Sequence, residues 1–142
     1  MDIPSSLIGA TATEGEIYFF TNDCPIGVKE HIHICIKHKG KILLFSTCSS
    51  QTDTAFRLAL LKGWNMNTFP VFTKNGTNKF KKEQTYVDCN HVLEISESEF
   101  GKLLKDKKIH LLDGTIDSLG LQLIANGIKL STEVERRIKD LF

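Results

Sequence analysis

The side chains best suited to chemistry lie between Lys29 and Gln51. His31 and His33 are two positions apart, and Ser49 and Ser50 follow the next apolar run. Imidazole exchanges protons near neutral pH, because its pKa in water is about 6.5. Hydroxyl groups can hydrogen-bond a phosphoryl oxygen, with help from the N–H groups at the start of a helix. These residue types therefore predict proton transfer at a phosphate ester.

A β-hairpin is needed to bring these groups together. The segment HIHICIK alternates strictly, so a strand places its isoleucines on one face and both histidines on the other. The segment HKGK supplies a turn, in which Gly40 can take a positive φ. The segment ILLF then returns as a buried strand. An antiparallel return predicts that Ser49 lies near His31.

Positive charge is added by a second hairpin tip. The segment KNGTNKFKK, residues 74–82, carries four lysines and no acid, and it contains the turn dipeptide Asn75-Gly76. Together with lysines of the first hairpin, it can form a patch that follows a phosphate backbone. Hydroxyl and amide groups of the first hairpin can add hydrogen bonds. The predicted RNA-binding residues are Lys29, Lys37, Thr47, Gln51, Lys74, Lys79, Lys81 and Lys82.

The overall composition is that of an ordinary folded domain. The chain has 142 residues, of which 41% are hydrophobic and 25% charged, so we expect one domain over residues 1–142. Its net charge of +1 excludes a general attraction to nucleic acid and leaves only local patches. The four cysteines have no CxxC spacing, which favours reduced packing thiols over disulfides or zinc. We expect no membrane contact and a cytoplasmic location, because membrane-span and signal patterns are missing.

The predicted fold class is α+β, with a small, strongly bent antiparallel sheet or barrel and peripheral helices. Beyond the first hairpin, strand patterns occur at residues 15–20, 69–73, 85–89 and 92–95. Helical spacing and caps predict helices at residues 52–63, 96–105, 113–127 and 131–141. Pro70 favours an edge position for its strand. We expect a barrel-like core at residues 15–105, a helical extension at 106–142 and a loosely held segment at 1–14.

Four segments, taken in order, resemble a known family. They are Gly15–Tyr18, Glu30–Ile36, Thr47–Gln51 and Thr85–Ile95. They are similar to the opening strand, the strand after an Arg-Pro pair, the Thr-Ser/Ala-Gln segment and the late strand pair of the MazF/PemK-like toxin endoribonucleases. Those toxins belong to type II toxin–antitoxin systems, and this chain would be a divergent member. The resemblance covers roughly residues 15–105.

The resemblance implies an SH3-like β-barrel that forms a homodimer and is neutralised by a cognate antitoxin protein. It also implies cleavage of single-stranded RNA without a metal or another cofactor. In the family, a strand arginine and a threonine carry the chemistry. Here His31 replaces the arginine, and Ser49 or Ser50 stands near the threonine.

We therefore expect His31, His33, Ser49 and Ser50 to be the catalytic residues. One imidazole would take the proton of an RNA 2′-OH, and the other would protonate the leaving 5′ oxygen. Ser49 and a lysine would stabilise the developing charge. The products would be a 2′,3′-cyclic phosphate and a 5′-OH end.

Two other functions are compatible with the same residues. The barrel could be a non-enzymatic module that binds RNA or a protein partner, with the histidines serving for contact only. It could also be a metal-dependent hydrolase with His31 and His33 as ligands, although the sequence offers no obvious third ligand at strand or helix spacing.

Overall fold

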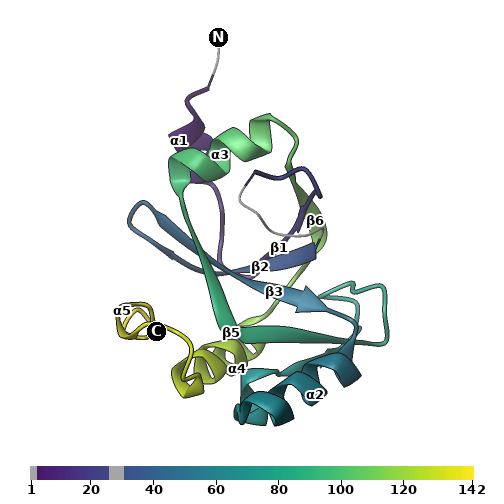
Figure 1. Ribbon diagram of the computed structural model, residues 1–142. Coiled ribbons are helices and arrows are strands. Elements are labelled where there is room, and N and C mark those ends of the chain that lie inside the picture. Colours follow the sequence, from purple (N-terminus) through teal and green to yellow (C-terminus); the bar gives the residue numbers. More distant parts are fainter. Residues whose placement is uncertain (1–2, 26–30) are drawn as a thin grey trace.

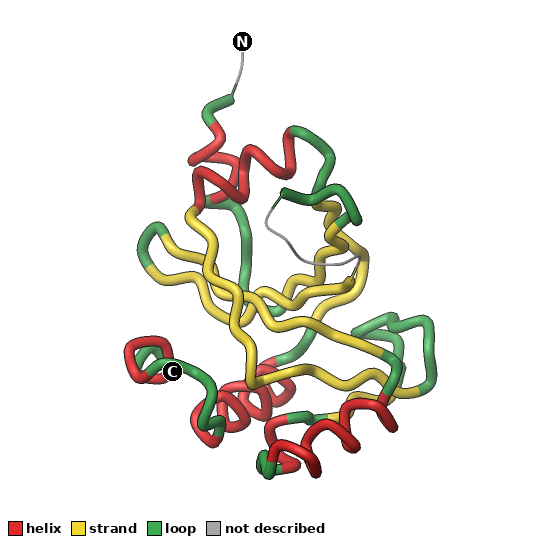
Figure 2. Tube along the Cα trace, in the orientation of Figure 1, coloured by secondary structure: helices red, strands yellow, loops and turns green. Residues whose placement is uncertain are grey.

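The computed structural model describes residues 3–25 and 31–142, which form an α+β fold around one sheet (Figure 1). The strands are β1 (Glu16–Phe20), β2 (His31–Lys39), β3 (Ile42–Ser49), β4 (Val71–Thr73), β5 (Gln84–Ser96) and β6 (Ile109–Thr115). They pair antiparallel in the order β4-β5-β3-β2-β1-β6. The sheet is strongly curled into a half-barrel (Figure 2). The predicted fold class is confirmed.

Helices cover both ends of this sheet. They are α1 (Ser5–Gly9), α2 (Thr52–Lys62), the 3₁₀ turn η1 (Met66–Thr68), α3 (Glu97–Lys105), α4 (Ser118–Leu130) and α5 (Arg136–Lys139). The pair α1 and α3 lies at one end, and α2 and α4 lie at the opposite end (Figure 1). None of the helices in residues 3–25 and 31–142 has the length and apolar content needed to cross a membrane.

The first hairpin has the register that the sequence predicts. Strand β2 pairs with β3, with Ile32 opposite Cys48 and His33 opposite Thr47. Gly40 occupies the turn with a φ of 60°, which favours glycine. The end of β3 therefore lies beside the start of β2, as expected.

Other local signals are also confirmed. Gly63 ends α2 in the left-handed conformation, with a φ of 69°. Ser96 Oγ accepts a hydrogen bond of 3.1 Å from Glu99 N and so caps α3. Strand β4, which follows Pro70, lies at an edge of the sheet.

Both faces of the sheet are buried. On one face, Ile17 and Ile34 pack in a cluster that includes Ile124 of α4. On the other face, Phe20 and Phe45 pack in a cluster with Phe100 of α3 and its neighbours. The alternation of β2 is as predicted up to Ile36 and is interrupted by an irregularity between Cys35 and Lys37. At His33 and Cys35 the histidine face turns toward a second core and not toward solvent. Burial on both sides stabilises the curled sheet through the hydrophobic effect.

The region after residue 105 differs from the prediction. It is not a purely helical extension, because β6 pairs with β1 and adds an edge strand, with His110 opposite Phe19. The predicted stop at Gly127 is wrong, since α4 continues to Leu130. Ser131 does not cap a following helix. Its Oγ donates a hydrogen bond of 2.7 Å to Asn90 Oδ1 in the interior.

Two further segments differ in detail. Residues 84–96 form one continuous strand, β5, where the sequence predicts two pieces. Residues 5–9 form α1, although the sequence predicts a loose segment. Helix α1 is held by close packing on α3, since a Cβ on Gly9 would lie 1.8 Å from Glu97 O.

Candidate functional site

A pocket of about 390 Å³ lies where the end of β3 meets the start of β2. Six predicted site residues line it and define what we call the His31 pocket: His31, Ser49, Ser50, Gln51, Lys81 and Lys82. Strand pairing explains the approach of the first four, because the pairs between Ile32 and Cys48 and between His33 and Thr47 place the chain after Cys48 beside His31. The two lysines come from the loop between β4 and β5.

His31 is the first residue of β2 and lies opposite Phe20 of β1. Its side chain is half-buried. The backbone oxygen of His31 lies 3.2 Å from Nδ1 of His33, within hydrogen-bond distance. His31 thus lies at a strand start and lines the pocket.

The hydroxyl groups lie between β3 and α2. Ser49 Oγ accepts a hydrogen bond of 3.1 Å from Gln51 N, and Ser49 pairs with Tyr86 of β5. Burial raises the pKa of Tyr86, while its hydrogen bond to Ser49 acts in the opposite direction. Gln51 is the N-cap residue of α2 and makes no capping bond through its side chain. The start of a helix therefore borders the pocket, which favours an anionic ligand.

The two pocket lysines belong to a segment with internal hydrogen bonds, residues 74–83, which we call the lysine loop. Asn78 is only 5% exposed. Its Oδ1 accepts hydrogen bonds of 3.1 Å from Asn75 N and Phe80 N, and its Nδ2 donates one of 3.0 Å to Thr73 O. Phe80 is buried in the same cluster as Ile34. The loop is therefore fixed from inside, and Lys81 and Lys82 follow directly after its buried phenylalanine.

His33 lies outside the pocket, and the expectation that it shares an accessible face with His31 is wrong. Its side chain is fully buried, and its ring stacks on Phe20 with centroids 4.0 Å apart. Burial lowers the pKa of His33 to about 4. Its Nε2 has no hydrogen-bond partner within residues 3–25 and 31–142. The physical reason is that Phe20 and its neighbours come from other strands to cover this face of β2.

Two other predicted contacts, Thr47 and Lys37, do not line the pocket. Thr47 is half-buried and pairs with His33. Lys37 lies near the far end of β2, with its Nζ 5.2 Å from the centroid of the Phe142 ring. Lys29 lies outside the described residues.

The remaining two lysines stand at the outer part of the lysine loop. Lys74 forms an exposed ion pair with Glu83, with Nζ 3.6 Å from Oε2. Lys79 is exposed and has a positive φ of 53°. Neither lines the His31 pocket, so the lysine loop contributes two of its four lysines to the site.

Sequence reasoning missed four strand residues that line the pocket, namely Phe19, Ile32, Cys48 and Thr85. Each is brought there by strand register, for which no local pattern is a signal. Burial raises the pKa of the Cys48 thiol far above its ordinary value. Cys48 is therefore a protonated packing residue and not a nucleophile.

The HxH pair does not form a metal site. The His33 ring faces the aromatic core, away from the pocket that His31 lines. Across the described residues, no group of three or more His, Cys, Asp and Glu side chains is placed to hold a metal ion.

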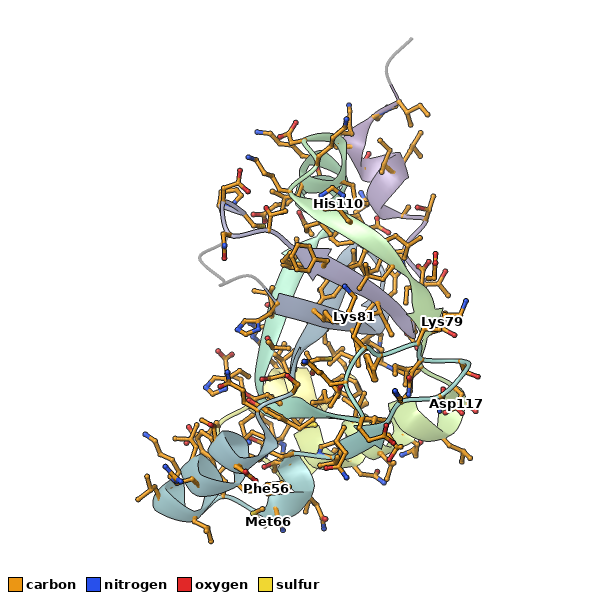
Figure 3. All side chains as sticks on the ribbon, turned by 90° about the vertical axis from the view of Figure 1, so that its right-hand side faces the viewer. Phe56, Met66, Lys79, Lys81, His110 and Asp117 are labelled. Carbon is orange, nitrogen blue, oxygen red and sulfur yellow. The ribbon has the colours of Figure 1, made fainter. Side chains whose placement is uncertain are left out.

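A second hollow, of about 530 Å³, lies between α2, η1 and α4. Phe56 and Met66 lie side by side in it (Figure 3). Its lining is apolar apart from Asn67 and Asn126 and contains no charged side chain. This second hollow therefore lacks the titratable and hydroxyl groups that line the His31 pocket.

No protein-family model matches this chain, and no curated protein matches it. The geometry of the His31 pocket combines one imidazole, two serine hydroxyls and two ammonium groups. Such a set can bind a phosphodiester and move one proton at it.

Proposed function

We propose that the protein is a toxin-like endoribonuclease that binds single-stranded RNA in the His31 pocket and cleaves it without a metal. The observation that carries this proposal is the convergence of His31, two serines and two lysines on one hollow of about 390 Å³. Lysine side chains attract the phosphate backbone, and an open pocket accepts an unpaired strand. A cognate antitoxin and a homodimeric state are part of the same proposal and rest on the resemblance to the MazF/PemK-like family.

The chemistry uses the ribose 2′-OH of the substrate as nucleophile. His31 takes the proton of this hydroxyl while the 2′ oxygen forms a bond to the adjacent phosphorus. The bond between phosphorus and the 5′ oxygen breaks, and that oxygen takes a proton from the ammonium group of Lys81 or Lys82. The products are a 2′,3′-cyclic phosphate and a 5′-OH end, and no oxidant, reductant or metal is needed.

The other pocket groups stabilise charge. The phosphorane carries extra negative charge on its non-bridging oxygens. Hydroxyl donors from Ser49 and Ser50 and the lysine ammonium groups meet this charge in a partly enclosed site. His33 takes no part in this step, because its ring is buried against Phe20 and does not line the pocket.

The direct test compares His31→Ala with the wild-type protein on a 5′-labelled single-stranded RNA. We expect His31→Ala to lower the cleavage rate by at least about 10²-fold, because a positioned general base contributes about 10²–10⁴-fold. His110→Ala is the matched control, since His110 is an exposed histidine of β6 outside the pocket. Equal rates in wild type and His31→Ala would refute the proposed mechanism.

Two further measurements define the reaction. Mapping of the RNA ends should find 2′,3′-cyclic phosphates, and EDTA should leave the rate unchanged. Ends that carry a 3′-OH, or a rate abolished by EDTA and restored by a divalent cation, would support a metal-dependent hydrolase instead.

A second candidate function is RNA binding without cleavage. It is favoured by the burial of His33, which leaves one imidazole in the pocket where the two-imidazole scheme needs two. Intact RNA after long incubation, together with salt-dependent binding that is lost on removal of Lys81 and Lys82, would support this module.

The antitoxin and the dimer are tested separately. Induced expression should arrest growth of the host cell, and coexpression of a small protein encoded beside this one should restore growth. Light scattering of the purified chain should report twice the mass of 16.0 kDa. Unchanged growth on induced expression would refute the toxin role. The cleavage assay would still test whether the protein cuts RNA.

A further inference from the structure

The two edges of the half-barrel meet through the lysine loop. Strands β4 and β6 are the edge strands of the sheet. The lysine loop leaves β4 and contacts β6, where Thr115 N donates a hydrogen bond of 3.0 Å to Thr77 O. One residue earlier on β6, a Cβ on Gly114 would lie 1.8 Å from Asn78 O. We call this backbone contact between residues 77–78 and 114–115 the seam.

The close contact with Asn78 requires a glycine at position 114, whereas the φ angle of this residue does not. Its φ lies outside the left-handed range that Gly15, Gly40 and Gly63 adopt. A residue with a side chain could therefore take the same backbone conformation. Glycine within a strand often marks the close approach of another backbone. Here the approaching backbone is that of Asn78.

The seam is connected to the pocket through Asn78. The same residue that touches Gly114 accepts a hydrogen bond from Phe80 N through its side chain. Phe80 directly precedes Lys81, which lines the pocket. In Figure 3, Lys79 lies next to the end of β6. Lys81 lies closer to the strands whose residues line the pocket. A shift of Asn78 away from β6 would therefore move the pocket lysines.

We propose that Gly114 is a positioning residue for the His31 pocket. Its missing side chain lets the lysine loop close on β6, and this closure sets the place of Lys81 and Lys82 relative to His31. The inference deepens the proposed function, because it concerns how the same pocket holds a sugar–phosphate chain. The seam itself can be measured without RNA.

The test uses Gly114→Ala, with Gly76→Ala as the matched control in the same loop. A Cβ on Gly76 meets no atom of the described residues within 4 Å. Trypsin cuts after lysine, so its cleavage after Lys79, Lys81 and Lys82 reports how often the loop opens. We expect Gly114→Ala to raise the rate of cutting in the loop by about tenfold or more, and Gly76→Ala to leave it unchanged.

RNA binding supplies the readout that a general loss of stability would not move. We expect Gly114→Ala to flatten the dependence of log K on log salt by about 1 to 2, as loss of one or two lysine–phosphate contacts does. Gly76→Ala should keep the wild-type slope. If wild type binds no RNA, the proposed function fails, while the trypsin rates still decide whether the seam orders the loop.

An unchanged rate of loop cutting in Gly114→Ala would overturn the inference. So would faster cutting with an unchanged salt slope, because the lysines would then not depend on the seam. If Gly114→Ala loses its circular dichroism signal, Thr115→Pro takes its place, since it removes the donated N–H at the end of an edge strand. Global unfolding of both variants would also overturn the inference, because the seam would then hold the whole sheet and would not serve the pocket.

Discussion

Because the imidazole of His33 is buried, the free energy of unfolding of this protein depends on pH in the acidic range. The side chain has no exposed surface, and its ring stacks on Phe20. No group in the described part of the chain accepts a hydrogen bond from its Nε2. Burial therefore lowers the pKa of His33 to about 4, from an ordinary value of 6.5. The folded protein holds this ring neutral at pH values where the unfolded chain protonates it.

The sign and size of the effect follow from this difference. Above about pH 6.5 the ring is neutral in both states, and stability does not depend on it. As the pH falls from about 6.5 to about 4, the unfolded state binds more protons than the folded state, so the free energy of unfolding decreases. Each tenfold change in proton affinity is worth about 1.4 kcal/mol, so the full loss is about 3 kcal/mol. At about pH 4.5, about 2 kcal/mol of this is already lost relative to pH 7.

His33→Phe is the variant that isolates this loss. It keeps an aromatic ring to stack on Phe20 and removes both titrating nitrogens. Urea unfolding at about pH 7 and about pH 4.5 should show that wild type loses about 2 kcal/mol more than His33→Phe between the two conditions. Other groups that titrate in this range are common to both proteins and cancel in the difference. His110→Gln is the control and should follow the wild-type pH dependence, because His110 is exposed.

Parallel pH curves for wild type and His33→Phe, within about 0.5 kcal/mol, would refute the reasoning. The ring would then be protonated in the folded state or reachable by water. The same variant also tests the role of His33 in chemistry. We expect His33→Phe to keep RNA cleavage within a few-fold of wild type, whereas loss of about 10²-fold or more would restore His33 as a proton donor or acceptor.

Three other expectations are open to measurement. Burial lowers the pKa of His38, but its hydrogen bonds, above all that of 2.6 Å to Glu97, raise this pKa overall, so the pair stabilises fully below about pH 6.5 and loses its effect as the pH rises. Glu97→Gln should therefore cost about 1.5–3 kcal/mol near pH 6 and much less near pH 9, as read from urea unfolding. Replacing both pocket lysines by alanine should reduce the salt slope of RNA binding by about 2, measured by titration at several salt concentrations. Gly101→Ala should lower the melting temperature, because its Cβ would lie 1.8 Å from a backbone oxygen of α1, whereas Gly76→Ala should not.

Local signals in the sequence determined much of the scaffold. The alternation HIHICIK and the turn at Gly40 predicted the first hairpin and the approach of Ser49 to His31, and both are observed. Pro70 predicted the edge strand, and Ser96 predicted the start of α3. These features depend on neighbours within a few residues, so one stretch of chain contains the information that specifies them.

The tertiary structure alone decided which imidazole is accessible. The pattern of β2 places His31 and His33 on one face but does not say what covers that face. Phe20 of β1 and the surrounding aromatic cluster cover His33. Strand β6 was missed for a related reason, since IHLLDGT does not alternate and gains its strand form by pairing with β1.

The assembly of the pocket was also decided by contacts between distant segments. Lys81 and Lys82 lie about 30 residues from Ser49 in the sequence, and the lysine loop that carries them closes on Gly114 of the opposite sheet edge. A single stretch of sequence cannot specify such an approach, because it depends on the curl of the sheet and on the packing of both faces. Residue types and local alternation thus determined which chemistry is available, and long-range packing decided which of these residues meet.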